Sequence, residues 1–164
     1  MTNNFEFEAD LAAKKIHVTR EFNAPIGKVW RAWTEPDLLE KWTVLKHWTA
    51  ITKTMEFYVG GVWLYAMVSP EGQKHWVYAK FTAIENLKAI STLGRFTDTD
   101  GNPIENGPTS NRDTRFVSLE GNRSKVEMTI TFEEESTLRM FVEGGFKEGL
   151  GITLEALDEL LEVE

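Results

Sequence analysis

The apolar residues of this chain change their period near residue 135. Val126, Met128, Ile130 and Phe132 occupy every second position, which predicts a β-strand with one solvated face. From Ser136 onward the spacing becomes three and four residues, which predicts a helix of about 25 residues. The apolar positions of this helix are Val142, Phe146, Leu150, Leu154, Leu157 and Leu161. A sheet and a long C-terminal helix must therefore bury their apolar faces together.

Glycines interrupt the first half of this helical pattern, at Gly144, Gly145, Gly149 and Gly151. Each glycine costs up to about 1 kcal/mol relative to alanine inside a helix. Two interpretations stay open. Either another group must approach the helix backbone closely, or the helix is kinked or begins late at these positions.

Upstream of residue 135 the chain is dominated by short strand-like segments. Gly60-Gly61, Pro70-Glu71-Gly72 and Glu120-Gly121-Asn122 mark tight turns between them. Strands linked by short loops must be antiparallel. In one segment, 62–68, the residues on both faces of the predicted strand are apolar, so we expect both faces to be at least partly covered. The strands are predicted at 15–22, 51–58, 62–68, 76–84, 89–96, 112–119 and 125–132.

Two short helices are predicted after the first strand. Pro25 is tolerated in the first turn of one, and Pro36 opens the other. Residues 1–12 are expected to form a loose lead-in. Residues 97–110 are rich in Asp, Asn, Gly and Pro and are expected to form a long loop. The whole, 1–164, is predicted to be a single α+β domain.

The charge and cysteine content of the chain limit which partners and which cellular compartment we expect. The formal net charge of -8 opposes binding to phosphate backbones, so nucleic acid is not expected as a partner. The chain has no cysteine, which excludes disulfides, thiolate catalysis and cysteine zinc sites. Neither a secretory signal nor an apolar run of membrane-spanning length is found. We therefore expect a cytoplasmic protein that makes no contact with a membrane.

Three segments carry a resemblance to a known family. The stretch from Val18 to Pro36, VTREFNAPIGKVWRAWTEP, resembles the opening of the SRPBCC superfamily. FYVGGVW, at 57–63, and VEGGFKEGL, at 142–150, are similar to elements of one branch. That branch is the one similar to the C-terminal domain of the activator of heat shock protein 90 ATPase. The resemblance extends over residues 14–162.

This resemblance implies a helix-grip fold, also called START-like or Bet v 1-like. In that fold a curved antiparallel sheet of about six to seven strands wraps around a long C-terminal α-helix. A cavity between sheet and helix takes apolar small molecules in many relatives. One segment departs from the branch, because residues 41–49, KWTVLKHWT, lack its Trp-Trp-Gly-Pro-like stretch. This segment is expected to border one end of the cavity.

No catalytic constellation is evident. The three histidines, His17, His47 and His75, have no metal-ligand spacing. There is no phosphate-binding glycine loop and no G-x-S-x-G motif. We therefore predict no metal and no cofactor, and we favour a binding protein over an enzyme.

The candidate ligand-binding residues are mostly aromatic. For each of them the alternative is plain core packing, and about half are expected to face a cavity. Arg115 is the candidate anchor for an acidic head group, its alternative being a surface cross-strand pair. The predicted set is Trp30, Trp42, His47, Trp48, Trp63, Tyr65, Trp76, Tyr78, Phe96, Arg115, Phe146 and Leu150.

The leading functional hypothesis is binding of a hydrophobic or amphipathic small molecule between the sheet and the C-terminal helix. The first alternative is a chaperone-related module acting in the stress response, by resemblance to the activator of heat shock protein 90 ATPase. The second alternative is a cyclase- or hydrolase-like enzyme that uses the same cavity. Homodimer formation stays open, because nothing in the sequence decides it.

Overall fold

The fold is built on one curved antiparallel sheet. The structure is a computed structural model, and it describes residues 5–163 of the chain. The strands are β1 (Glu6–Asp10), β2 (Lys15–Phe22), β3 (Thr49–Met55), β4 (Val62–Val68), β5 (Lys74–Glu85), β6 (Ala89–Arg95), β7 (Thr109–Leu119) and β8 (Arg123–Phe132). The helices are α1 (Ile26–Thr34), α2 (Pro36–Trp42), α3 (Glu135–Glu143) and α4 (Phe146–Val163). The eight strands follow the order β1-β2-β8-β7-β6-β5-β4-β3.

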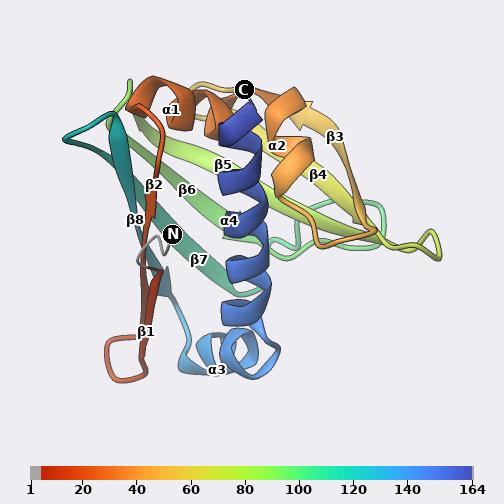
Figure 1. Cartoon of the computed structure of the whole chain (residues 1–164). Helices are drawn as coiled ribbons and strands as arrows, with labels where there is room; N and C mark the ends of the chain where they lie inside the picture. Colours follow the sequence, from red (N-terminus) through yellow and green to blue (C-terminus); the bar gives the residue numbers. More distant parts are fainter. Residues whose placement is uncertain (1–4, 164) are drawn as a thin grey trace.

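Helix α4 lies across the concave face of the sheet, with α1 and α2 at one end and α3 at the other (Figure 1). The predicted α+β class and the helix-grip arrangement are thus confirmed. Among residues 5–163, no helix is long and apolar enough to cross a membrane.

Strand β1 was not predicted, because residues 1–12 were expected to form a loose lead-in. It pairs antiparallel with β2, from Glu6 opposite Thr19 to Asp10 opposite Lys15. Phe7 points to the α4 side, where its ring lies 6.1 Å from that of Phe146. Alternation of apolar and acidic residues over 5–8 is the signal of a half-buried strand. Residues 1–4 lie outside the described part of the chain.

The single helix expected from Ser136 is two helices, α3 and α4. The backbone N–H of Gly144 donates to Met140 O at 2.9 Å and ends α3. Gly145 then adopts a φ of +86°, which glycine accepts without steric cost. The kink interpretation therefore holds at these two glycines.

The close-approach interpretation holds further along α4. A Cβ placed on Gly151 would lie 3.4 Å from the ring of Phe5, so this side chain, just before β1, packs closely against the helix backbone. A Cβ on Gly149 would meet nothing within 4 Å. Gly149 therefore borders open space, and Gly151 is the position where another side chain approaches.

The core lies between the β2–β8–β7 side of the sheet and helices α1 and α4. Ile16, Phe22, Leu138, Leu154 and Leu157 are fully buried there. Every second residue of β8 is buried, as the predicted alternation requires. Strand β4 has three consecutive buried residues, which confirms that both of its faces are covered.

The segment between β6 and β7 is held in a defined conformation on the far face of the sheet. The Asp98 carboxylate accepts hydrogen bonds from the backbone N–H groups of Asp100 and Asn102, both at 2.9 Å. These hydrogen bonds, led by the one from Asn102, hold the pKa of Asp98 below its ordinary value. The indole N–H of Trp76 donates to Thr99 O at 3.1 Å. The expected long loop therefore covers part of β5.

The two edges of the sheet are β1 and β3. The pairing of β3 with β4 is regular except for a bulge between Thr52 and Thr54. A second irregularity lies in β5, between Phe81 and Ala83. Such bulges bend a sheet and increase its twist, so both contribute to the curvature around α4.

Candidate functional site

The sheet face that meets α4, here called the inner face, has two halves that differ in accessibility. In one half, Phe81 of β5, Ile90 of β6 and Phe116 of β7 are buried in the core. In the other half, side chains of β5, β6, β7 and the neighbouring β4 point the same way but are only half-buried. We call this second region the open half; it comprises Trp63, Val77, Ala79, Thr92 and Arg112. Solvent therefore reaches the inner face beneath the first half of α4.

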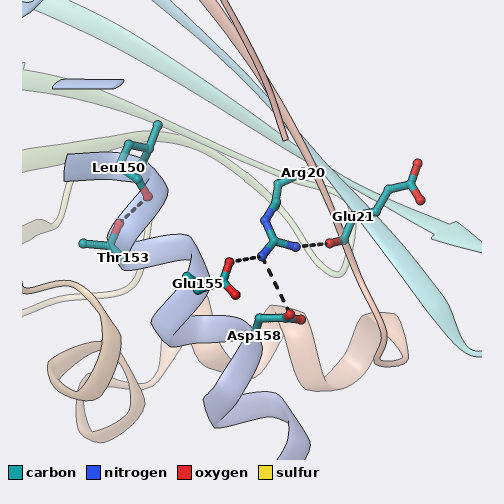
Figure 2. A network of polar contacts seen from close by, with 6 residues as sticks. All are labelled: Arg20, Glu21, Leu150, Thr153, Glu155 and Asp158. Carbon is teal, nitrogen blue, oxygen red and sulfur yellow. Dashed lines mark hydrogen bonds and ion pairs between the residues drawn. The ribbon is translucent and has the colours of Figure 1, made fainter. Parts of the chain in front are cut away.

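The inner face carries two arginines, and the first of them, Arg20, is fully paired. It projects from β2 to α4, where its Nη2 lies 3.2 Å from Glu155 Oε2 and 3.7 Å from Asp158 Oδ2 (Figure 2). Its Nη1 donates to Glu21 O at 2.6 Å. Only 5% of Arg20 is exposed, so this ion-pair network fastens one flank of α4 to the sheet.

The second arginine, Arg112, projects from β7 beneath the other end of α4. It is paired in register with Thr92 of β6, and its guanidinium carbon lies 5.9 Å from the centre of the Phe146 ring. Among residues 5–163, no carboxylate forms an ion pair with Arg112 and no acceptor receives its hydrogen bonds. Burial lowers the pKa of Arg112 from its ordinary value, and Tyr65 partly offsets this effect. Arg112 is thus an inward-facing cation with no counter-ion in the described chain.

Three further hydrogen-bonding side chains accompany Arg112. The rings of Trp63 and Tyr65 are stacked, with centroids 4.5 Å apart, and Thr52 lies opposite Tyr65 in the strand register. Trp63 Nε1 and Thr52 Oγ1 are buried without a hydrogen-bond partner among the described residues. Burial raises the pKa of Tyr65 to about 12, although the charge of Arg112 acts in the opposite direction. We call Thr52, Trp63, Tyr65 and Arg112 the polar cluster.

Small residues form the floor between Arg112 and Tyr65. Ala79 of β5 is paired with Gly94 of β6, and both lie on strands between β4 and β7. Neither residue can cover the sheet with a large side chain. The inner face is therefore low between Arg112 of β7 and Tyr65 of β4.

The predicted residues that lie at this region are Trp63, Tyr65, Phe146 and Leu150. The last two belong to the first turns of α4 and pack against the core while staying half-buried. The rings of Trp48 and His75 lie together, with centroids 5.4 Å apart, and His75 is paired with Met67 of β4, two residues beyond Tyr65. The neighbouring His47 is exposed and has a φ of 69°, so it does not face inward from a strand.

Two predicted residues belong to the core. The Trp42 Nε1 donates to Ala32 O at 2.9 Å, which joins α2 to α1. The ring of Trp30 packs edge-to-face on Phe116, with centroids 5.1 Å apart. Both tryptophans are buried, at 7% and 5% exposure for Trp30 and Trp42, so core packing explains them.

Three predicted residues point to the outer face, which corrects their expected place in the cavity, and a fourth, Phe96, is exposed just after the end of β6. Trp76 and Tyr78 alternate with Val77 and Ala79 and so point to the outer face, where a Cβ on Gly101 would lie 3.0 Å from the Trp76 ring. Phe96 follows β6 and is 37% exposed. Arg115 is exposed on the outer face, because Thr114 and Phe116 beside it are buried inward.

Two hollows in the described part of the chain lie away from the polar cluster. One of about 250 Å³ on the outer face contains Arg115 together with Asp113 and Glu127. The other, of about 10 Å³, lies where Lys28 and Leu38 approach the end of α4. The candidate site is therefore defined by the polar cluster and by the solvent-accessible residues of the open half, and by neither of these hollows.

Sequence reasoning missed Thr52 and Arg112. Arg112 could have been found from the alternation of β7, since Arg112, Thr114 and Phe116 share one face of this strand and the last two are buried. Val117 on the opposite face is also apolar, which left the inward parity ambiguous. Pairing with β8 resolves it, because Arg112 lies opposite the buried Ile130.

Comparison with known proteins identifies relatives over nearly the full chain. The model of the family described as Activator of Hsp90 ATPase homolog 1-like protein matches residues 23–162. No sequence among the curated proteins matches the chain. A solution structure of a protein from Arthrobacter aurescens is 30% identical, with a TM-score of 0.88 over 97% of this chain and 92% of the other. A crystal structure from Mycobacterium smegmatis is 26% identical, with a TM-score of 0.87 over 96% and 97%.

Proposed function

Since the chain belongs to the family of Activator of Hsp90 ATPase homolog 1-like proteins, we propose that it binds an apolar or amphipathic small molecule on the open half of its inner face. The ligand would lie between the floor of Ala79 and Gly94 and the first turns of α4. Apolar walls with a few converging polar groups are typical of small-molecule sites.

The observation that carries this proposal is the pair of buried donors without partners, Trp63 Nε1 and Thr52 Oγ1. A buried polar group that lacks a hydrogen bond costs about 1–3 kcal/mol. A ligand that accepts these hydrogen bonds would remove that cost. Val77, Phe146 and Leu150 supply apolar surface nearby that is still accessible to solvent.

The composition of the polar cluster favours binding over acid–base catalysis. Thr52, Trp63, Tyr65 and Arg112 can all donate hydrogen bonds, and none of them is a carboxylate or an imidazole. With its pKa raised, Tyr65 stays protonated at neutral pH. The cluster is therefore suited to holding acceptor atoms in place.

Binding is expected to be seen with phenylnaphthylamine, a neutral fluorescent probe that brightens in apolar surroundings. Ala79→Phe would place a ring on the floor of the open half and is expected to weaken binding by roughly tenfold or more, the equivalent of about 1.4 kcal/mol. Fluorescence titration of the folded variants measures this change.

The matched control is Lys80→Phe, which adds the same ring at the next position of β5, on the outer face, where Lys80 is exposed. Its affinity for the probe should equal that of the unaltered chain. Equal loss in both variants, or saturable binding that neither variant changes, would contradict the proposed location. Absence of probe binding to the unaltered chain would contradict the proposed function itself.

A second candidate function, association with a chaperone, is favoured by one surface feature. Tyr58 and Val59, between β3 and β4, are 58% and 60% exposed, an unusual place for two adjacent apolar side chains. If they contact a chaperone, the double variant Tyr58→Ser/Val59→Ser should lose co-purification with heat shock protein 90 and any stimulation of its ATPase. Unchanged co-purification would reject this surface as the contact.

A further inference from the structure

Resting on the proposed function, we infer that the ligand is an organic anion whose acidic head group is held by Arg112, with its apolar body beneath the first turns of α4. The geometry of the two inner-face arginines leads to this assignment. It goes beyond apolar binding because it gives the ligand a charge and an orientation.

The comparison of Arg20 with Arg112 is the first step of the argument. Both point from the sheet to the α4 side. Arg20 meets two carboxylates and a carbonyl oxygen, so its charge is neutralised within the fold. Arg112 forms no ion pair within residues 5–163, and its guanidinium lies over the face of the Phe146 ring. Arg112 is half-buried, and even partial burial of a cation without a counter-ion is unfavourable, so the fold is better suited to a bound anion than to an empty site.

The neighbours of Arg112 are the second step. Tyr65 can donate from its phenolic O–H, and Trp63 donates from an indole N–H that has no partner in the described chain. A guanidinium presents its N–H groups in a planar fork that matches the two oxygens of a carboxylate. Donors on the same sheet face as a cation without a counter-ion favour an acceptor-rich head group, and they disfavour a cationic ligand.

The preference for an anion that we infer at Arg112 does not extend to the hollow on the outer face. Arg115 there shares the hollow with Asp113 and Glu127, so negative charge already surrounds it. The chain as a whole carries a formal net charge of -8, which does not attract anions over long distances. A preference for an anion must therefore arise from contact with Arg112.

Two probes with one ring system test the inference. Phenylnaphthylamine is neutral, and anilinonaphthalene sulfonate carries the same rings with a sulfonate. The unaltered chain is expected to bind the sulfonate probe roughly tenfold to a hundredfold more tightly, the range of one or two charge-assisted hydrogen bonds. Arg112→Met should bring the ratio of the two affinities close to one. Arg115→Met, in the same strand but on the outer face, should keep both.

The outcomes separate the inference from the proposed function. If the neutral probe binds and the sulfonate probe binds no more tightly, the anion assignment is wrong and the proposed function stands. Loss of the preference in Arg115→Met to the same extent would also overturn it. If neither probe binds, the proposed function fails and the inference fails with it.

A second measurement does not depend on the Arg112 variant being folded. The indole N–H signal of Trp63, assigned with Trp63→Phe, is followed by nuclear magnetic resonance in the unaltered chain. Saturating sulfonate probe should move this signal more than saturating neutral probe does, because an acceptor oxygen is then in contact. Equal shifts with the two probes would count against a head group at the polar cluster.

Discussion

Replacing Gly61 with alanine is expected to lower the free energy of unfolding by about 3 kcal/mol, in the upper range of overpacking changes. A Cβ on Gly61 would lie 2.1 Å from the backbone oxygen of Glu56, a distance that no relaxation of a side chain can relieve. The backbone between β3 and β4 must move instead. This segment is bonded to β5, since Gly60 N–H donates to Phe81 O at 2.8 Å and Phe81 N–H donates to Gly61 O at 2.9 Å.

The displacement would reach the core, because Phe81 is only 3% exposed and its ring packs 5.2 Å from that of Phe57. Thermal unfolding measures the effect, and the loss corresponds to about 6–12 °C for a chain of this size. Gly27→Ala is the matched control, since a Cβ there meets nothing within 4 Å and Gly27 lies in α1. It is expected to raise stability by up to about 1 kcal/mol. Similar melting temperatures for the two variants would show that the close approach at Gly61 is not real.

Arg20→Met is expected to cost about 3 kcal/mol, the lower end of the range for breaking a buried ion pair. Methionine preserves much of the volume, so the loss reports mainly on charge. Glu155 is 68% exposed and regains water readily, whereas Asp158 is only 16% exposed and does so less well. Urea denaturation gives the change in free energy of unfolding directly.

An exposed arginine provides the comparison for this change. Arg139 pairs with Glu135 at 2.8 Å, and both side chains are about half exposed, at 52% and 47%. Arg139→Met should therefore cost less than about 1 kcal/mol, the usual range of a surface pair. A double-mutant cycle of Arg20→Met with Asp158→Asn should show a coupling of about 1–2 kcal/mol. Strictly additive effects would show that Arg20 and Asp158 do not act on one another.

Much of the fold could be predicted from local pattern. The alternation in β8 and the three- to four-residue spacing of α4 each reflect one buried face, so periodicity and structure agree there. The break between α3 and α4 could not be placed, because glycines at 144, 145, 149 and 151 carry the same local signal. Only tertiary neighbours, such as Phe5 at Gly151, distinguish them.

The candidate site was harder to predict, because it depends on which face of each strand turns inward. Trp76 and Tyr78 were expected in the site for their aromatic rings, but the register of β5 points them to the other face. Arg115 and Arg112 lie in one strand and differ only in parity. A shift of one residue exchanges the two faces of a strand, and loops and bulges decide that shift.

The exposed edges of the sheet bear on how the molecule avoids self-association. An unpaired strand invites another chain to add to it, and aggregation is the usual outcome. Here β1 presents the exposed carboxylates of Glu6, Glu8 and Asp10, while β3 combines its bulge with the exposed Lys53. Charge and irregularity at the two margins discourage strand addition. The sheet can therefore keep two free edges without recruiting a second chain.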